Sequence, residues 1–167
     1  MALPEGVRPR YGIFTTDREF ADYEIDRYVK YHDCGCAKRV KSANDSYAVM
    51  EDGTEYKWIR PNDTARGCKC SVGIIDLGTC TIEFIRDWIP YICLFAEPEK
   101  ENYVFRDSTN TKDSEPYDLH TLIDRLQKVE ALLGSVKKIG FYDFEYGWQR
   151  ITYLDADKIE ITFNTDC

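Results

Sequence analysis

The chain lacks several features that would place it in a known class of proteins. No apolar run among its 167 residues approaches the ~20 that a membrane-spanning helix needs. Its first residues have neither the charged start nor the apolar core of a signal peptide. The phosphate-cradling loop G-x-x-x-x-G-K-[S/T] does not occur, and there are only two histidines. We therefore expect a cytoplasmic protein that binds no membrane and has no P-loop.

Positive charge is also scarce. The 22 Lys and Arg are outnumbered by 30 Asp and Glu, so the net charge is -8. This balance disfavours direct contact with nucleic acid and suits a protein that docks on a basic surface. The short basic cluster AKRVK, residues 37–41, runs against this trend. Aromatic residues are plentiful, with 12 Tyr and 3 Trp, and such residues fill cores and protein interfaces alike.

Residue periodicity predicts helices and strands in mixed order over the first half. A helix is expected over residues 15–32, with Thr16 and Glu19 as a capping box. Its tyrosines stand near helical spacing, and they could fill the core or form a protein interface. The segments SYAVM and EYKWI, joined by EDGT, predict a β-hairpin.

A strand over Cys68–Asp76 and a short helix should follow this hairpin. The helix would be capped by Thr81 and ended or bent by Pro90.

The second half predicts a helix followed by strands. Residues 97–116 are the most polar part and indicate a linker or surface loop, with one edge strand at NYVFR. The segment 118–134 has a continuous apolar face and Gly134 as its C-cap. We expect this helix to pack on a three-stranded antiparallel meander. The predicted class is α+β, with an N-terminal subdomain (1–96), a linker (97–116) and a helix-plus-meander unit (117–167) that could share one core.

The stretch DTARGCKCSVGIIDLG, residues 63–78, carries the most specific pattern. A buried strand ending in Asp76 resembles a Walker B element, whose Asp holds the water shell of Mg²⁺. With the preceding hairpin and the following helix, residues 44–95 resemble the Walker B neighbourhood of phage terminase large subunits and of short uncharacterised phage proteins. The resemblance implies ancestry among mobile elements. ATP hydrolysis is not expected, because the P-loop is absent and Leu77 stands where a catalytic Glu would be. We expect Asp76 to cap the following helix instead.

Two Cys-x-Cys pairs form an alternative metal site. Cys34, Cys36, Cys68 and Cys70 would supply four thiolates to a structural zinc ion, although the one-residue spacing is shorter than usual. Strand alternation favours the other interpretation, in which Cys68 and Cys70 are core residues. His32 could pair with a nearby thiolate if the fold brought the two together. No cofactor is therefore expected, with zinc as the alternative.

No complete catalytic set is evident, so we expect a non-enzymatic protein that acts by binding. The resemblance and the acidic charge favour a phage or mobile-element protein that binds a host protein, such as an inhibitor of an antiviral defence system of the anti-CRISPR kind. The alternatives are a nucleotide- or nucleic-acid-binding module derived from an ATPase fragment and a zinc-stapled adaptor. The candidate binding residues are Arg66, Asp76, Asp143, Glu145, Tyr146 and Trp148.

Overall fold

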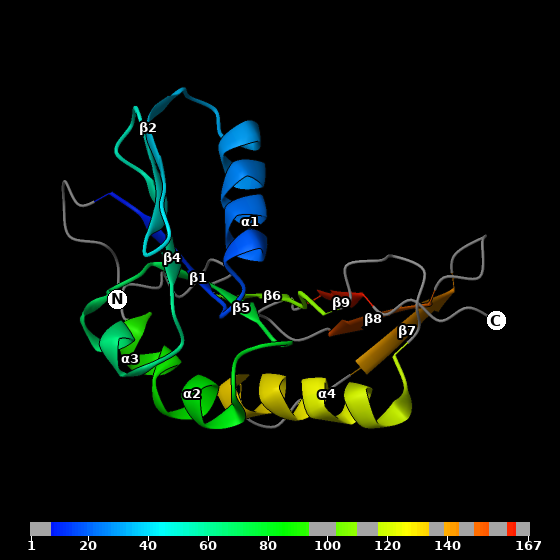
Figure 1. The fold of residues 1–167 in the computed structure, drawn as a ribbon. Coiled ribbons are helices and arrows are strands. Elements are labelled where there is room, and N and C mark those ends of the chain that lie inside the picture. The colour runs from blue at the N-terminus through cyan, green and yellow to red at the C-terminus, as the bar shows by residue number, and fades with distance from the viewer. Residues whose placement is uncertain are drawn as a thin grey trace.

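The core of the molecule is a six-stranded mixed sheet. The computed structural model describes residues 8–93, 103–109 and 117–133, and the strands 139–143, 149–153 and 160–162. The sheet has the order β2-β3-β4-β1-β5-β6 (Figure 1). Its strands are β1 (Arg10–Phe14), β2 (Cys36–Lys41), β3 (Ser46–Met50), β4 (Glu55–Ile59), β5 (Val72–Asp76) and β6 (Tyr103–Arg106).

Parallel pairing distinguishes this sheet from the predicted α+β arrangement. β1 pairs in parallel with both β4 and β5, and β5 pairs in parallel with β6. The predicted hairpin is confirmed as β3 and β4, and Gly53 adopts the positive φ of 86° that their turn requires. The edge strand expected at NYVFR is confirmed as β6. The fold is thus a mixed α/β structure, and the first strand was not anticipated.

Helices cover both faces of the sheet. On one face lies α1 (Arg18–Tyr31), which contacts β1, β3 and β4. The other face carries the short 3-10 helix η1 (Asp63–Gly67), α2 (Ile82–Asp87) and α3 (Ile89–Ile92). Neighbouring residues of β1 point to opposite faces, so Ile13 packs in the core under α1 and Phe14 in the core under α2 and α3.

Helix ends correct one prediction and confirm another. Asp17 caps α1, because its Oδ1 accepts a hydrogen bond from the backbone N–H of Phe20 at 3.1 Å. The predicted capping box at Thr16 was therefore wrong by one residue. Thr81 caps α2 as expected, with its Oγ1 accepting from the N–H of Phe84 at 3.2 Å. Pro90 was expected to end or bend this helix; α2 ends at Asp87, and Pro90 stands at the start of the next helix, α3.

The fourth helix packs differently from the prediction. α4 (Leu119–Leu133) contacts α2, and its Val129 is buried in the same core as α2 and α3. The strands β7 (Ile139–Asp143), β8 (Gln149–Tyr153) and β9 (Glu160–Thr162) form a second, antiparallel sheet. The described packing of α4 is thus on α2 and on the core beneath it, and not the packing on a meander that the sequence predicted. The predicted C-cap Gly134 lies outside the described residues.

Among the described residues, no helix combines the length and the apolar character that crossing a membrane requires.

Candidate functional site

Asp76 lies at the carboxyl end of β5 and is completely buried. Its Oδ1 accepts hydrogen bonds from the backbone N–H groups of Gly78 at 3.0 Å and Ser108 at 2.9 Å. Its Oδ2 accepts from the hydroxyls of Thr15 at 2.6 Å and Thr79 at 2.7 Å. A carboxylate offers about four acceptor positions. All four acceptor positions of Asp76 are occupied. The four hydrogen bonds join the carboxyl ends of β1, β5 and β6.

This saturation changes the interpretation of Asp76. The residue is not the cap of α2, because Thr81 has that role. A Walker B aspartate needs a free oxygen directed at the water shell of a metal ion, and both oxygens of Asp76 are engaged by the protein itself. The contact described for Arg66 is also with the protein itself, since its guanidinium lies 3.8 Å from the centre of the Trp88 ring. The contacts described for both predicted nucleotide-binding residues thus lie within the protein.

A second buried carboxylate anchors α4 beside Asp76. Asp107, which follows β6, accepts a bond from Arg125 Nε of α4 at 2.7 Å and one from the Tyr117 hydroxyl at 2.6 Å. Burial alone would raise the pKa of Asp107, but hydrogen bonds from Arg125, Thr109 and Tyr117 outweigh it and lower the pKa. Lys128 Nζ donates to the carbonyl oxygen of Leu77 at 2.7 Å. The end of the sheet is thus held by polar contacts within the chain.

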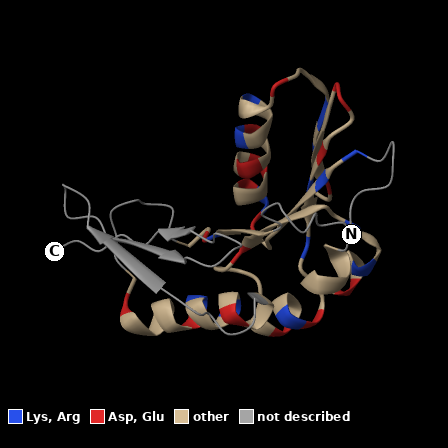
Figure 2. Ribbon diagram, turned by 180° about the vertical axis from the view of Figure 1, so that it is seen from behind, with Lys and Arg blue, Asp and Glu red and all other residues tan. Residues whose placement is uncertain are grey.

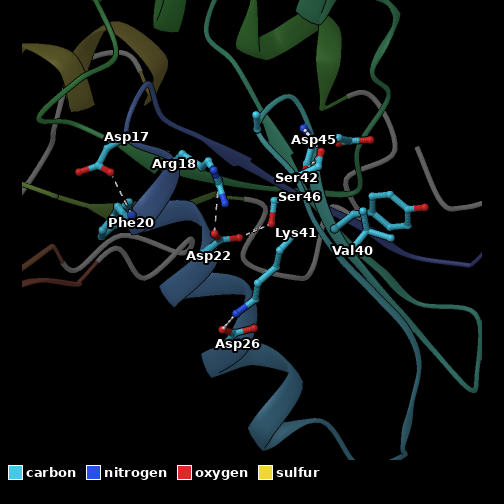
Figure 3. A network of polar contacts seen from close by, with 12 residues as sticks. Asp17, Arg18, Phe20, Asp22, Asp26, Val40, Lys41, Ser42, Asp45 and Ser46 are labelled. Atoms are coloured by element: carbon cyan, nitrogen blue, oxygen red, sulfur yellow. Dashed lines mark hydrogen bonds and ion pairs between the residues drawn. The ribbon is translucent and has the colours of Figure 1, made fainter.

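The basic cluster of residues 37–41 is engaged by α1. Arg39 of β2 donates to Asp26 Oδ1 at 2.9 Å and to Asp22 Oδ1 at 3.0 Å, and Lys41 Nζ donates to Asp26 Oδ2 at 2.6 Å. The hydroxyl of Ser46 also donates to Asp22 (Figure 3). We call this set of five residues the α1 latch. Because the latch holds Arg39 and Lys41 against aspartates, they are poorly placed to contact nucleic-acid phosphates.

The latch also affects the titration of its acids. Burial would raise the pKa of Asp22, but hydrogen bonds from Ser46 and Arg39 and the nearby positive charges lower it. The pKa of Asp26 is lowered against burial in the same way, by hydrogen bonds from Lys41 and Arg39. Both carboxylates therefore stay charged and paired well below neutral pH.

The solvent side of α1 carries exposed aromatic residues. Tyr23 is 63% exposed and Tyr31 is 74% exposed. Arg27 lies midway between them along the helix, and residues four apart share one side of a helix. The opposite side, with Ala21 and Ile25, is buried. We call Tyr23, Arg27 and Tyr31 the α1 ridge. Charged residues of both signs lie along α1 (Figure 2).

The four cysteines proposed as zinc ligands are not brought together. Cys34 packs against the core under α1, whereas Cys68 and Cys70 belong to the core on the opposite face of the sheet. Cys36 is exposed. β5 begins only at Val72, so Cys68 and Cys70 precede the strand in which they were predicted.

Cys70 is nevertheless a core residue, as expected, and burial raises the pKa of its thiol to about 12. The described residues do contain another group of metal-binding type, formed by His32, Cys34 and Asp52.

The remaining predicted residues lie near the C-terminal end. Asp143 is the last residue of β7. Glu145, Tyr146 and Trp148 lie outside the described residues. Their assignment to a binding surface stays a prediction.

Comparison of the chain with protein-family models, with curated proteins and with solved structures finds no match.

Proposed function

We propose that this protein acts by binding another protein, and that the α1 ridge is its contact surface. The exposure of Tyr23 and Tyr31 on one side of α1 is the observation that carries this proposal. Tyr and Arg are enriched among the residues that dominate the binding energy of protein interfaces. In the α1 ridge, two tyrosines flank an arginine on one regular helix.

The ridge is held in a fixed orientation before any partner binds. Ala21 and Ile25 anchor the buried side of α1 in the core, and the α1 latch ties the helix to the edge strand β2. Arg27 is held as well, because its guanidinium bonds to Glu24 at 3.1 Å and lies 5.3 Å from the centre of the Tyr28 ring. A surface ordered in advance loses less conformational entropy on binding.

The partner that we propose is a host protein with a basic surface. The net charge of -8 favours encounter with a positively charged partner, such as a nucleic-acid-binding protein. The resemblance of residues 44–95 to phage sequences supports a protein of phage or mobile-element origin that inhibits a host defence system. Binding of this kind should become slower as salt is added, because screening weakens long-range attraction.

The nucleotide-binding alternative has less support. It requires Asp76 and Arg66 to face a ligand, and the contacts of both residues lie within the protein. We expect no increase in melting temperature when Mg²⁺ and a nucleotide are added together.

A matched set of tyrosine variants tests the proposal. The wild-type chain, the double variant Tyr23→Ala/Tyr31→Ala and the control Tyr91→Ala would each be used to capture proteins from lysate of the natural host. Tyr91 is 66% exposed but lies on α3, on the opposite face of the sheet. All three substitutions remove an exposed ring, so melting temperatures should stay close together.

The proposal makes a specific prediction for this comparison. A host protein retained by the wild type and by Tyr91→Ala should bind the double variant at least about tenfold more weakly, because truncating a central interface residue typically costs more than about 1 kcal/mol. Equal retention by all three chains, or loss only in Tyr91→Ala, would overturn the assignment to the α1 ridge.

A further inference from the structure

Three side chains of metal-binding type converge where the end of α1 meets the β3–β4 turn. A ring nitrogen of His32, the sulfur of Cys34 and a carboxylate oxygen of Asp52 all lie within 4.8 Å of one another. We propose that these three residues bind one zinc ion. This inference does not depend on the proposed function, because it concerns a different set of side chains and a different ligand.

The spacing of the ligand atoms suits zinc. Zinc bonds of about 2.0–2.3 Å to nitrogen, oxygen and sulfur place neighbouring ligand atoms of a tetrahedron roughly 3.4–3.6 Å apart. His32 Nε2 and Asp52 Oδ2 are already 3.3 Å apart. The Cys34 sulfur lies within 4.8 Å of the other two ligand atoms, so it has to approach them by at most roughly 1.4 Å.

The imidazole of His32 is oriented by a neighbour, as in known zinc sites. Its Nδ1 lies 2.8 Å from the hydroxyl oxygen of Tyr56, which is buried in the core under α1. When Nε2 binds the metal, Nδ1 carries the ring proton and donates a hydrogen bond to the Tyr56 oxygen. A hydroxyl oxygen can accept a hydrogen bond as well as donate one. A partner of this kind on the second nitrogen fixes the ring and its tautomer.

The backbone also holds the ligands in place. The N–H of Glu51 donates to the carbonyl oxygen of Gly35 at 2.9 Å, which ties the loop of Cys34 to the hairpin of Asp52. Asp52 Oδ1 accepts from the N–H of Thr54 at 2.8 Å, so the other carboxylate oxygen faces His32. This backbone bond, with further bonds from the Thr54 hydroxyl and His32, lowers the pKa of Asp52 to about 2. The carboxylate is therefore charged throughout the physiological range.

The ligand chemistry selects the metal. A thiolate and an imidazole favour zinc over calcium or magnesium, which prefer oxygen ligands alone. Three protein ligands leave a fourth tetrahedral position, and the exposed Asp52 leaves the group open to solvent so that water can fill it. The ion would staple the last turn of α1 to the hairpin.

Cobalt is the probe for this site, because a thiolate bound to Co²⁺ gives a charge-transfer absorption that zinc displaces. The full-length chain titrated with Co²⁺ should develop this absorption at one equivalent. Cys34→Ser should abolish it, and His32→Gln should weaken cobalt binding at least about tenfold. The controls Cys36→Ser and Cys68→Ser should leave it unchanged, and they also distinguish this site from a four-cysteine site.

Melting temperatures with and without zinc test the site in a variant that is expected to fold. Asp52 is exposed and lies in a turn, so Asp52→Asn should keep the fold while weakening the site. Zinc should raise the melting temperature of the wild type and have a clearly smaller effect on Asp52→Asn. The proposal is overturned if the wild type shows no cobalt–thiolate absorption, or if Cys36→Ser or Cys68→Ser removes it while Cys34→Ser does not.

Discussion

Removing the carboxylate of Asp76 tests whether this residue is a structural cross-link. In Asp76→Ala, the backbone N–H groups of Gly78 and Ser108 lose their acceptor inside the protein. The hydroxyls of Thr15 and Thr79 are affected less, because their oxygens are 3.1 Å apart and can bond to each other. The substitution therefore leaves the amides of two partly buried residues without their acceptor and opens the junction of β1, β5 and β6.

The expected loss of stability follows from these contacts. An unsatisfied buried donor costs roughly 1–3 kcal/mol. Two donors at partly buried residues, with the removal of a buried charge as an offset, give a loss of about 2 kcal/mol for Asp76→Ala. In Asp76→Asn, the amide oxygen can accept from both N–H groups and the amide nitrogen can donate to the threonine oxygens. This variant exchanges charged hydrogen bonds for neutral ones, so it should lose only about 1 kcal/mol.

Urea unfolding followed by circular dichroism measures both variants against the wild type. The cross-link account requires a large effect for Asp76→Ala and a small one for Asp76→Asn. It would be refuted if Asp76→Ala were as stable as the wild type, or if the two variants were equally unstable. Asp76→Asn should also retain the host partner, because the carboxylate makes no contact with the α1 ridge in this account.

Three further predictions concern the charged and thiol groups of the described residues. Arg39→Ala should lower the free energy of unfolding by about 2 kcal/mol and Lys41→Ala by less than about 0.5 kcal/mol. The reason is that only the arginine is largely buried in the latch. Equal losses in urea unfolding would contradict this prediction. The raised pKa of Cys70, about 12, predicts that iodoacetamide leaves its thiol unmodified in the folded protein at pH 8 and alkylates it in urea. Mass spectrometry that finds Cys70 modified in the folded state would refute its assignment to the core. Arg125→Ala should cost about 2 kcal/mol at pH 7. Because the folded-state pKa of Asp107 is lowered, this contribution is present above about pH 4 and lost as the pH falls through the folded-state value, so a difference from wild type that stays constant from pH 7 to pH 2 would contradict it.

Local patterns in the sequence predicted the local parts of the fold. The hairpin follows from two alternating segments around an Asp-Gly turn, and these signals lie within sixteen residues. Parallel pairing of β1 with β4 and β5 joins segments more than forty residues apart, and no local pattern encodes it. The same limit applies to Asp76, whose partners Thr15 and Ser108 are 61 and 32 residues away.

The candidate sites show the same division between local and distant information. The tyrosines of the first helix were recognised, but the two alternatives for them could be separated only by the orientation of α1. The structure packs a partly buried Tyr28 against the core and exposes Tyr23 and Tyr31. The sequence indicates a possible pairing of His32 with Cys34 or Cys36 and leaves that choice open. It indicates only a turn at Asp52, because the proximity of Asp52 depends on the packing of the hairpin against α1.

Hydroxyl-radical footprinting of the complex with the captured host protein tests the central claim most directly. The measurement compares the oxidation of individual tyrosine side chains in the free and bound protein. Binding through the α1 ridge predicts that Tyr23 and Tyr31 become protected while Tyr91 keeps its free-state reactivity. Unchanged oxidation of Tyr23 and Tyr31 in a fully formed complex would contradict the proposal.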